Sequence, residues 1–175
     1  MVHVGPPSLC PQALFRIQTM AEKHTILFKK ASGDAPVKDS VEAWNIACTD
    51  AEFKPMEETK EIAERDWPDE DGVDTYIPSK MPLKAYDMEV ELCYKGDYES
   101  AYDAIASFMD YLTGEDGSGS EFTFYVPYTQ IGRSGCYLKS FAPDDFWSGK
   151  GGDGLTFSIT IRVTNPKSEA TLENA

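Results

Sequence analysis

Two stretches of the chain alternate between apolar and polar side chains. Between residues 86 and 95, the apolar positions are Tyr86, Met88, Val90, Leu92 and Tyr94. Between residues 155 and 164, they are Leu155, Phe157, Ile159, Ile161 and Val163. A period of two is typical of a β-strand that has one buried face and one solvated face. We therefore predict two long strands, each with one side against a core and the other in water.

Shorter apolar stretches predict further strands, at residues 24–30, 121–126 and 136–142. Segments rich in glycine and polar residues, at 128–135 and 143–154, predict loops between strands.

Two segments keep alternatives open. Residues 41–48 (VEAWNIAC) fit either a strand or a helical turn. Residues 52–65 contain strong helix formers but also Pro55, so they fit either a helix or an extended polar segment.

One helix is predicted at about residues 99–113. Its apolar side chains recur at helical spacing, at Ala101, Ile105, Phe108, Met109 and Leu112. Ser100 with Asp103 predicts an N-terminal cap, and Gly114 stands where a left-handed C-terminal cap belongs. Strands with one inserted helix predict a mainly β fold of the α+β kind, an antiparallel β-sandwich or open barrel.

The pattern of elements predicts a single β domain at residues 20–166. Residues 1–19 precede a change in composition at Met20, so they form a loose N-terminal tail, or translation starts at Met20 and not at Met1. Asn165-Pro166 ends the last strand, and residues 167–175 are expected to form a frayed tail.

The composition excludes several classes of function. The chain has 175 residues, 41% hydrophobic content and a net charge of −14, which predicts a folded protein that repels phosphates and anionic membranes. We expect no sequence-specific nucleic acid binding and no membrane partner. The four cysteines, Cys10, Cys48, Cys93 and Cys136, are scattered, which favours buried thiols in a reducing compartment over a disulfide pair or a zinc site.

The acidic stretch RDWPDEDGVDTYIP, residues 65–78, invites a metal or catalytic interpretation. A calcium loop with Gly72 at its sixth position would place Trp67 and Pro78 where ligands are required, so that register fails. A cation among Asp69, Asp71 and Asp74 stays open as an alternative. Catalysis needs a partner base or nucleophile, and none can be assigned, so we expect no enzyme activity and no cofactor.

The same stretch also reads as a turn with aromatic anchors that docks on a neighbouring subunit. Tyrosine and tryptophan are common at interfaces because they offer large contact areas at low entropic cost. Arg133 is a candidate ion-pair partner for the acids of this loop. The predicted subunit-interface residues are Trp67, Asp69, Asp71, Tyr76, Arg133, Phe146 and Trp147.

These segments resemble a known family. RDWPDEDGVDTYIP, KAYDMEVELCYKG and AYDAIASFMDYLTG, followed by YTQIGRSGCYLKSF and LTFSITIRVTNP, resemble the N-terminal domain of distal tail proteins of long-tailed bacteriophages and prophages. The versions carried by gut Bacteroidetes are the most similar in appearance. The resemblance covers roughly residues 21–166, and its motifs are structural.

The resemblance implies a virion structural protein of the phage tail, assembled in the cytoplasm of the bacterial host. It implies a homo-oligomeric ring, commonly a hexamer, that joins the tail tube to the baseplate hub proteins and the host-recognition apparatus. Tail tube, terminator and hub proteins share related folds and remain alternative assignments. Larger members carry a second, C-terminal domain that this sequence does not show, so direct receptor binding is not expected.

Two other classes of function stay open. One is a carbohydrate- or small-molecule-binding β-sandwich that uses exposed tyrosine and tryptophan as stacking platforms. The other is a metal-dependent hydrolase built on the acids at residues 66–74.

Overall fold

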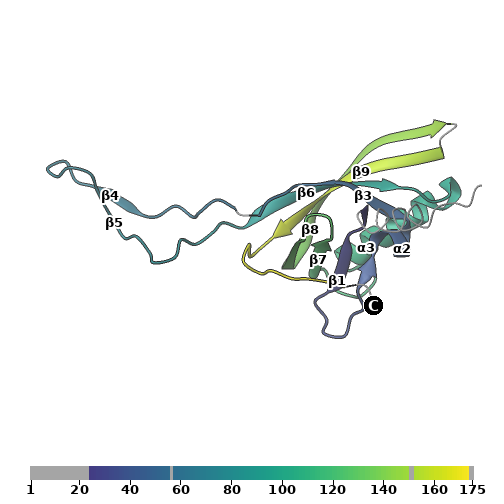
Figure 1. Ribbon diagram of the computed structural model, residues 1–175, viewed down its shortest axis with the longest axis horizontal. Coiled ribbons are helices and arrows are strands. Elements are labelled where there is room, and N and C mark those ends of the chain that lie inside the picture. Colours follow the sequence, from purple (N-terminus) through teal and green to yellow (C-terminus); the bar gives the residue numbers. More distant parts are fainter. Residues whose placement is uncertain (1–23, 56, 150–151, 174–175) are drawn as a thin grey trace, which may run out of the picture.

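A seven-stranded antiparallel sheet in the order β2-β1-β7-β8-β9-β6-β3 forms the body of the protein (Figure 1). The computed structural model describes residues 24–55, 57–149 and 152–173, without the side chains of residues 147–153. The sheet strands are β1 Leu27–Lys30, β2 Lys38–Asp39, β3 Ile46–Ala51, β6 Tyr86–Tyr94, β7 Phe122–Val126, β8 Ile131–Gly149 and β9 Gly152–Val163. The remaining elements are α2 Ser40–Trp44, β4 Glu64–Asp66, β5 Val73–Thr75, the 3₁₀ turn η2 Tyr98–Ser100 and α3 Ala101–Thr113. The predicted mainly β fold class is confirmed.

The two strongly alternating segments pair with each other. β6 and β9 form an antiparallel ladder from Tyr86 opposite Val163 to Tyr94 opposite Leu155. Their apolar side chains lie on the same side of the sheet, and Met88, Val90 and Ile161 are fully buried. The period of two therefore predicted both strands and their buried faces correctly.

The two edges of the sheet are consecutive in the sequence. β2 and β3 lie at opposite edges, yet only the five residues of α2 and Asn45 separate them. The sheet must therefore curl until its edges approach, which gives an open barrel and not a closed one. Asp39 begins α2 by accepting hydrogen bonds from the backbone N–H groups of Val41 (2.8 Å) and Glu42 (3.2 Å). Residues 41–48 thus contain both of the alternatives that their sequence allowed, a helical turn and then a strand.

Helix α3 packs its apolar face against the inside of the curled sheet. The Phe108 ring lies 5.8 Å from Phe28 of β1, 5.2 Å from Trp44 of α2 and 6.3 Å from Phe157 of β9, centroid to centroid. All four of these side chains are buried. One side chain of α3 therefore contacts β1, α2 and β9.

The ends of α3 agree with the prediction at one end only. Gly114 adopts a left-handed conformation (φ 85°) and closes the helix as expected. The predicted capping by Ser100 is wrong, because its side chain makes no capping hydrogen bond. The turn η2 leads into the helix, so Ser100 has helical dihedral angles (φ −98°, ψ 0°), whereas a capping residue is normally extended.

Strands β8 and β9 extend well beyond their predicted ends. β8 begins at Ile131, inside the segment predicted as a loop at 128–135, and the predicted loop at 143–154 is mostly a projecting β-hairpin. A register shift between Pro143 and Phe146 accommodates the proline, and Thr156 Oγ1 accepts a hydrogen bond from the backbone N–H of Asp145 (3.1 Å). Proline, aspartate and glycine are common in turns, so this segment was predicted to be a loop. The sequence does not reveal the bulge that lets these residues continue the strand.

The C-terminal tail is partly ordered on the body. The backbone N–H of Ser134 donates to the carbonyl of Ser168 (3.0 Å), and that of Ala170 donates to Gly132 (3.2 Å). A Cβ atom on Gly132 would stand 2.1 Å from the Ala170 carbonyl oxygen, so glycine permits this close approach. Residues 168–170, within the segment predicted to be a frayed tail, therefore lie against the start of β8. The predicted N-terminal tail, residues 1–19, lies outside the described residues.

Replacing Phe108 with alanine should destabilise the body strongly. The substitution removes a fully buried ring from the contact between α3, α2 and the sheet, and such losses cost about 3–5 kcal/mol of unfolding free energy. Urea denaturation followed by circular dichroism measures the effect. Tyr102→Ala is the matched control, because Tyr102 lies on the same helix with 82% of its side chain exposed and should change stability by less than about 0.5 kcal/mol.

Candidate functional site

A long extended arm leaves the body between β3 and β6 (Figure 1). We define the arm as residues 52–85; its two sides run antiparallel, with Thr59 opposite Leu83 and then β4 opposite β5. The Lys60 N–H donates to the Pro82 carbonyl (2.8 Å) and the Lys84 N–H to the Glu58 carbonyl (2.9 Å). Of the two alternatives for residues 52–65, the extended segment is the one observed.

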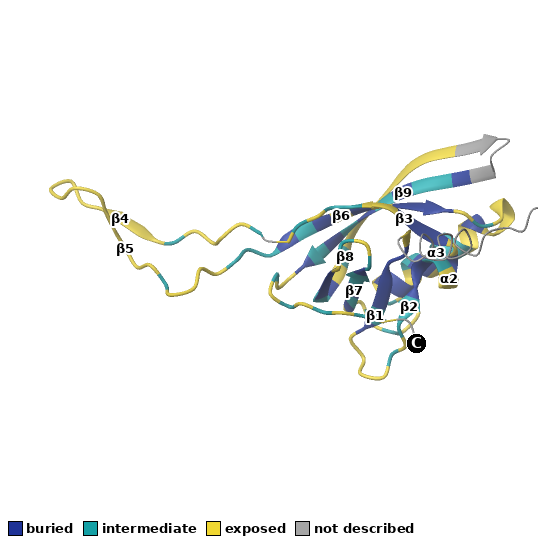
Figure 2. Ribbon diagram, in the orientation of Figure 1, coloured by how far each residue is buried: buried dark blue, intermediate teal, exposed yellow. Residues whose placement is uncertain are grey.

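The arm is exposed along most of its length, in contrast to the buried body (Figure 2). Every residue of β4 and β5 is exposed. Because the arm buries almost no apolar surface of its own, its conformation is supported mainly by local hydrogen bonds and ring contacts.

A small set of polar contacts shapes the tip, which we define as residues 64–77. The Arg65 guanidinium stacks over the Trp67 ring at 3.7 Å from its centroid. On the ring's edge, Trp67 Nε1 donates to Asp74 Oδ2 (3.2 Å), across the hairpin. Gly72 takes a positive φ of 88° in the turn. The tip therefore has a defined shape, although it is exposed.

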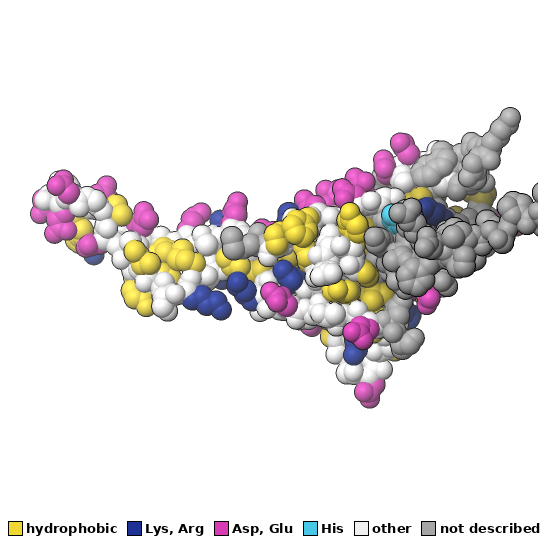
Figure 3. All heavy atoms as spheres, viewed as in Figure 1, with side chains coloured by type: hydrophobic (Ala, Val, Ile, Leu, Met, Phe, Trp, Pro, Cys, Tyr) yellow, Lys and Arg dark blue, Asp and Glu magenta, His cyan; other side chains and the backbone are white. Residues whose placement is uncertain are grey.

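The tip presents carboxylates and apolar side chains together. Figure 3 shows acidic side chains gathered at the far end of the arm. The exposed carboxylates there are Glu64, Asp66, Asp69, Glu70, Asp71 and Asp74. The exposed large apolar side chains, with their exposed fractions, are Trp67 36%, Val73 50%, Tyr76 80% and Ile77 73%. Of the predicted interface residues, Trp67, Asp69, Asp71 and Tyr76 thus lie together on this tip.

Val73 and Ile77 belong to the same exposed surface but were not predicted. Their signal in the sequence is weak, since each is a single apolar residue within a polar and proline-containing stretch. Only the hairpin pairing of β4 with β5 places Val73 beside the aromatic anchors.

Charged side chains fix the root of the arm to the body. Lys54 Nζ lies 2.8 Å from Glu52 Oε2 and donates to the Asp87 carbonyl (3.0 Å). The Asp87 carboxylate pairs with Lys139 and, at 2.9 Å, with Arg162. These two hydrogen bonds hold the pKa of Asp87 below its usual value. The arm therefore starts from a position braced across three neighbouring strands, β6, β9 and β8.

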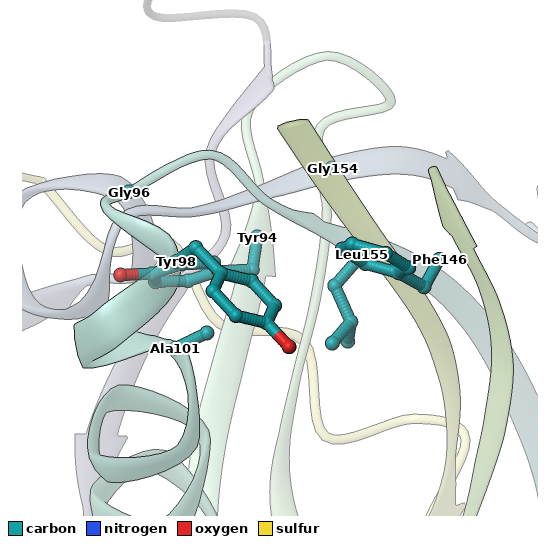
Figure 4. Close-up of a pocket in the computed structure, with 7 residues that line it drawn as sticks. All are labelled: Tyr94, Gly96, Tyr98, Ala101, Phe146, Gly154 and Leu155. Carbon is teal, nitrogen blue, oxygen red and sulfur yellow. The ribbon is translucent and has the colours of Figure 1, made fainter. Parts of the chain in front are cut away.

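The predicted residue Phe146 lies far from the tip, on the β8–β9 hairpin at the other end of the molecule (Figure 1). Its ring contacts Tyr98 at 5.5 Å and is 54% exposed. Figure 4 shows both rings beside Tyr94 and Leu155, around a cavity of about 10 Å³. That volume holds about one water molecule, so the contact is a packing seam and not a ligand pocket. Trp147 follows on the same hairpin, where side chains are not described.

Arg133 is buried in the body at 6% exposure. Its Nη1 donates to the Gly132 carbonyl at 2.8 Å, and the guanidinium lies near the buried Tyr86. The structure therefore places Arg133 in the body of the protein and not on the exposed tip.

The described cysteines are buried free thiols. Cys48, Cys93 and Cys136 form no disulfide, while Cys10 lies outside the described residues. Burial raises the pKa of Cys48 and of Cys136 to about 12, and it also raises the pKa of Cys93.

Two general features of the described residues bear on the site. No three side chains of histidine, cysteine, aspartate or glutamate there lie close enough to hold a metal ion. In the same part of the chain, no helix has the length and apolar character needed to cross a membrane.

The thiols should be unreactive at pH 8 in the folded protein. The raised pKa values keep Cys48 and Cys136 protonated, and the thiolate is the reactive form. Titration of a Cys10→Ser variant with a chromogenic disulfide reagent should show slow reaction until denaturant is added. Fast reaction of the folded variant at pH 8 would contradict the expected protection of the thiols.

The same pKa shifts affect stability. Because folding raises the pKa values of Cys48 and Cys136 above the ordinary 9.0, their contribution to stability is complete below about pH 9 and is lost as the pH rises toward 12.

The fold has structural similarity to a known phage protein. No family model matches the chain, and no curated protein matches it. The fold is similar to that of SPP1 Dit (gp 19.1), a protein described as a paradigm of the hub adsorption apparatus in Gram-positive infecting phages. The TM-score is 0.47 with 12% sequence identity, over 81% of this chain and 50% of that chain. The chain thus spans about half the length of the Dit protein.

Proposed function

We propose that the chain is a structural protein of a phage or prophage tail, of the distal tail type, that works by assembling into a homo-oligomeric ring. The observation that carries the proposal is the exposed arm, which ends in a shaped tip bearing aromatic, aliphatic and acidic side chains. In this proposal the arm is the main contact between neighbouring subunits.

The energetics of the arm favour a binding partner. β4 and β5 have three residues each, and an isolated two-stranded hairpin is marginally stable at best in water. Tyr76 and Ile77 also expose most of their surface to water. Exposed apolar surface is unfavourable in free energy, and burial against another protein would remove that penalty. Covering the tip would therefore stabilise the arm and bind the partner at once.

The sequence resemblance supports the finer parts of the proposal. It suggests a ring of six subunits in the virion tail, between the tail tube and the baseplate hub, assembled in the host cytoplasm. The net charge of −14 suits a ring through which DNA passes without adhering, because like charges discourage contact with phosphates.

The proposed role is not catalytic. The carboxylates of the tip lie on an exposed hairpin, where no enclosed space would exclude water from a reaction. Their use in the proposal is electrostatic: they direct which surface the tip can meet.

A second candidate function, carbohydrate binding, is favoured by one observation. A hollow of about 910 Å³ beside the edge strand β3 has two exposed aromatic rings in its lining, Phe53 (66%) and Tyr128 (71%). Sugar rings stack on such surfaces. Glycan-array binding that is lost in Phe53→Ala and Tyr128→Ala variants with intact folding would support this role over assembly.

Replacing the most exposed apolar side chains of the arm should weaken assembly. We expect the purified chain to form oligomers at micromolar concentration, seen as rings by negative-stain electron microscopy. A Tyr76→Ser/Ile77→Ser variant should raise the dissociation constant by roughly tenfold or more, since about 1.4 kcal/mol of lost apolar contact suffices. Sedimentation velocity over a concentration series measures the change.

Tyr102→Ser is the matched control, because it removes a tyrosine of similar exposure from α3 and not from the arm. This variant should assemble like the unmodified chain. A strictly monomeric unmodified chain at high micromolar concentration, with no ring after addition of tail tube or hub proteins, would reject the proposed function.

A further inference from the structure

A groove with a cationic rim lies at the root of the arm. It runs between residues 80–83 of the arm and residues 165–167, which follow β9. The two segments are neighbours because Tyr86, at the start of β6, pairs with Val163, at the end of β9. The groove has a volume of about 320 Å³. An engineered protein cavity of about 150 Å³ admits benzene, so this groove has room for an aromatic side chain and a neighbour.

The lining of the groove complements the tip in charge and polarity. Met81, Pro82, Leu83 and Pro166 provide apolar surface, while Lys80 and Lys167 provide positive charge. No residue of the lining is acidic. Both lysines are exposed, and neither forms an ion pair with another described residue, so both are available to an acidic partner. The tip also has apolar side chains, but they are surrounded by carboxylates, so its charge is opposite to that of the groove. The basic residue of the tip, Arg65, is stacked on Trp67.

The turn between β4 and β5 lies at the end of the arm that is farthest from the body, whereas residues 165–167 of the groove follow β9 on the body (Figure 1). The turn of the tip is therefore separated from the groove of its own chain. Fully extended, the stretch from Glu52 to Asp69 spans at most roughly 55 Å, at about 3.3 Å per residue. The radius of gyration expected for a 100-residue body is about 13 Å. The arm is therefore long enough to pass from one body to the next.

We infer that the groove formed by residues 80–83 and 165–167 receives the arm tip, residues 64–77, of a second copy of this chain. The contact is head-to-tail, because one surface is the tip and the other is the root of the arm. Contacts of this kind close into rings when the rotation between subunits permits. The inference rests on the proposed function, and it specifies the surface that the arm would meet.

Charge reversal on either side of the contact should weaken assembly. In a Lys80→Glu/Lys167→Glu variant the groove would repel the acidic tip, and in an Asp69→Lys/Asp71→Lys variant the tip would repel the groove. We expect each variant alone to raise the dissociation constant at least about tenfold. Lys95→Glu is the control, because it changes the charge of an exposed lysine just beyond the opposite end of β6.

An equimolar mixture of the two reversed variants provides the decisive measurement. Each acidic groove can then receive a basic tip, and each unaltered tip can enter an unaltered groove, so assembly should recover to within about threefold of the unmodified chain. Recovery also shows that both variants are folded. Assembly of the unmodified chain should weaken when salt rises from about 0.1 M to about 1 M, because the Debye length falls from about 10 Å to about 3 Å.

The outcomes separate this inference from the proposed function. If the unmodified chain forms rings that the groove variant also forms with the same affinity, the groove assignment is wrong and the proposed function stands. If both reversed variants lose assembly and their mixture does not recover, the groove assignment is likewise wrong. If the unmodified chain is a monomer under all conditions, both fail.

Discussion

The direction of the arm depends on an unbroken pairing between β6 and β9. The two strands face each other over nine residues without a register shift, and their apolar sides form much of the core. The last residue of the arm lies directly before Tyr86, so any slip of one residue would turn the buried face of β6 outward and reorient the arm with it. The ion pairs of Asp87 with β8 and β9 reinforce the same register from the solvated side. The pairing of β6 with β9 thus sets the direction of the arm and, with it, the position of the tip.

The parts of the fold that could be predicted were those governed by local periodicity. β6, β9 and α3 each carry a full apolar pattern, and each forms near its expected position. The projecting half of the β8–β9 hairpin could not be predicted, because Pro143 and the following aspartates give a loop signal that a bulge overrides. The order on the tail at Ala170 depends on a hydrogen bond to Gly132, a residue far earlier in the sequence. Long-range contacts of this kind leave no periodic trace.

The candidate site was predictable in its chemistry and not in its position. Trp67, Tyr76 and the surrounding acids were recognised as an anchored acidic turn, and they do lie together. Nothing in the sequence says that this turn stands at the end of a projecting arm, because extended polar strands and surface loops have similar compositions. For Arg133 the position was mispredicted in the other direction. An arginine in a glycine-rich segment is expected at the surface, but the start of β8 and the tail that lies against it bury Arg133.

The curling of the sheet also has a consequence for its two outer strands. One outer strand, β2, has only two residues, and the other, β3, is interrupted by an irregularity between Cys48 and Asp50. Short or bulged outer strands offer a poor template for additional backbone pairing, which is a common protection against aggregation. The body therefore offers little opportunity for backbone pairing between the sheets of separate copies of the chain. Any contact between copies of the chain would then depend on side chains and not on backbone hydrogen bonds, so single substitutions can change it.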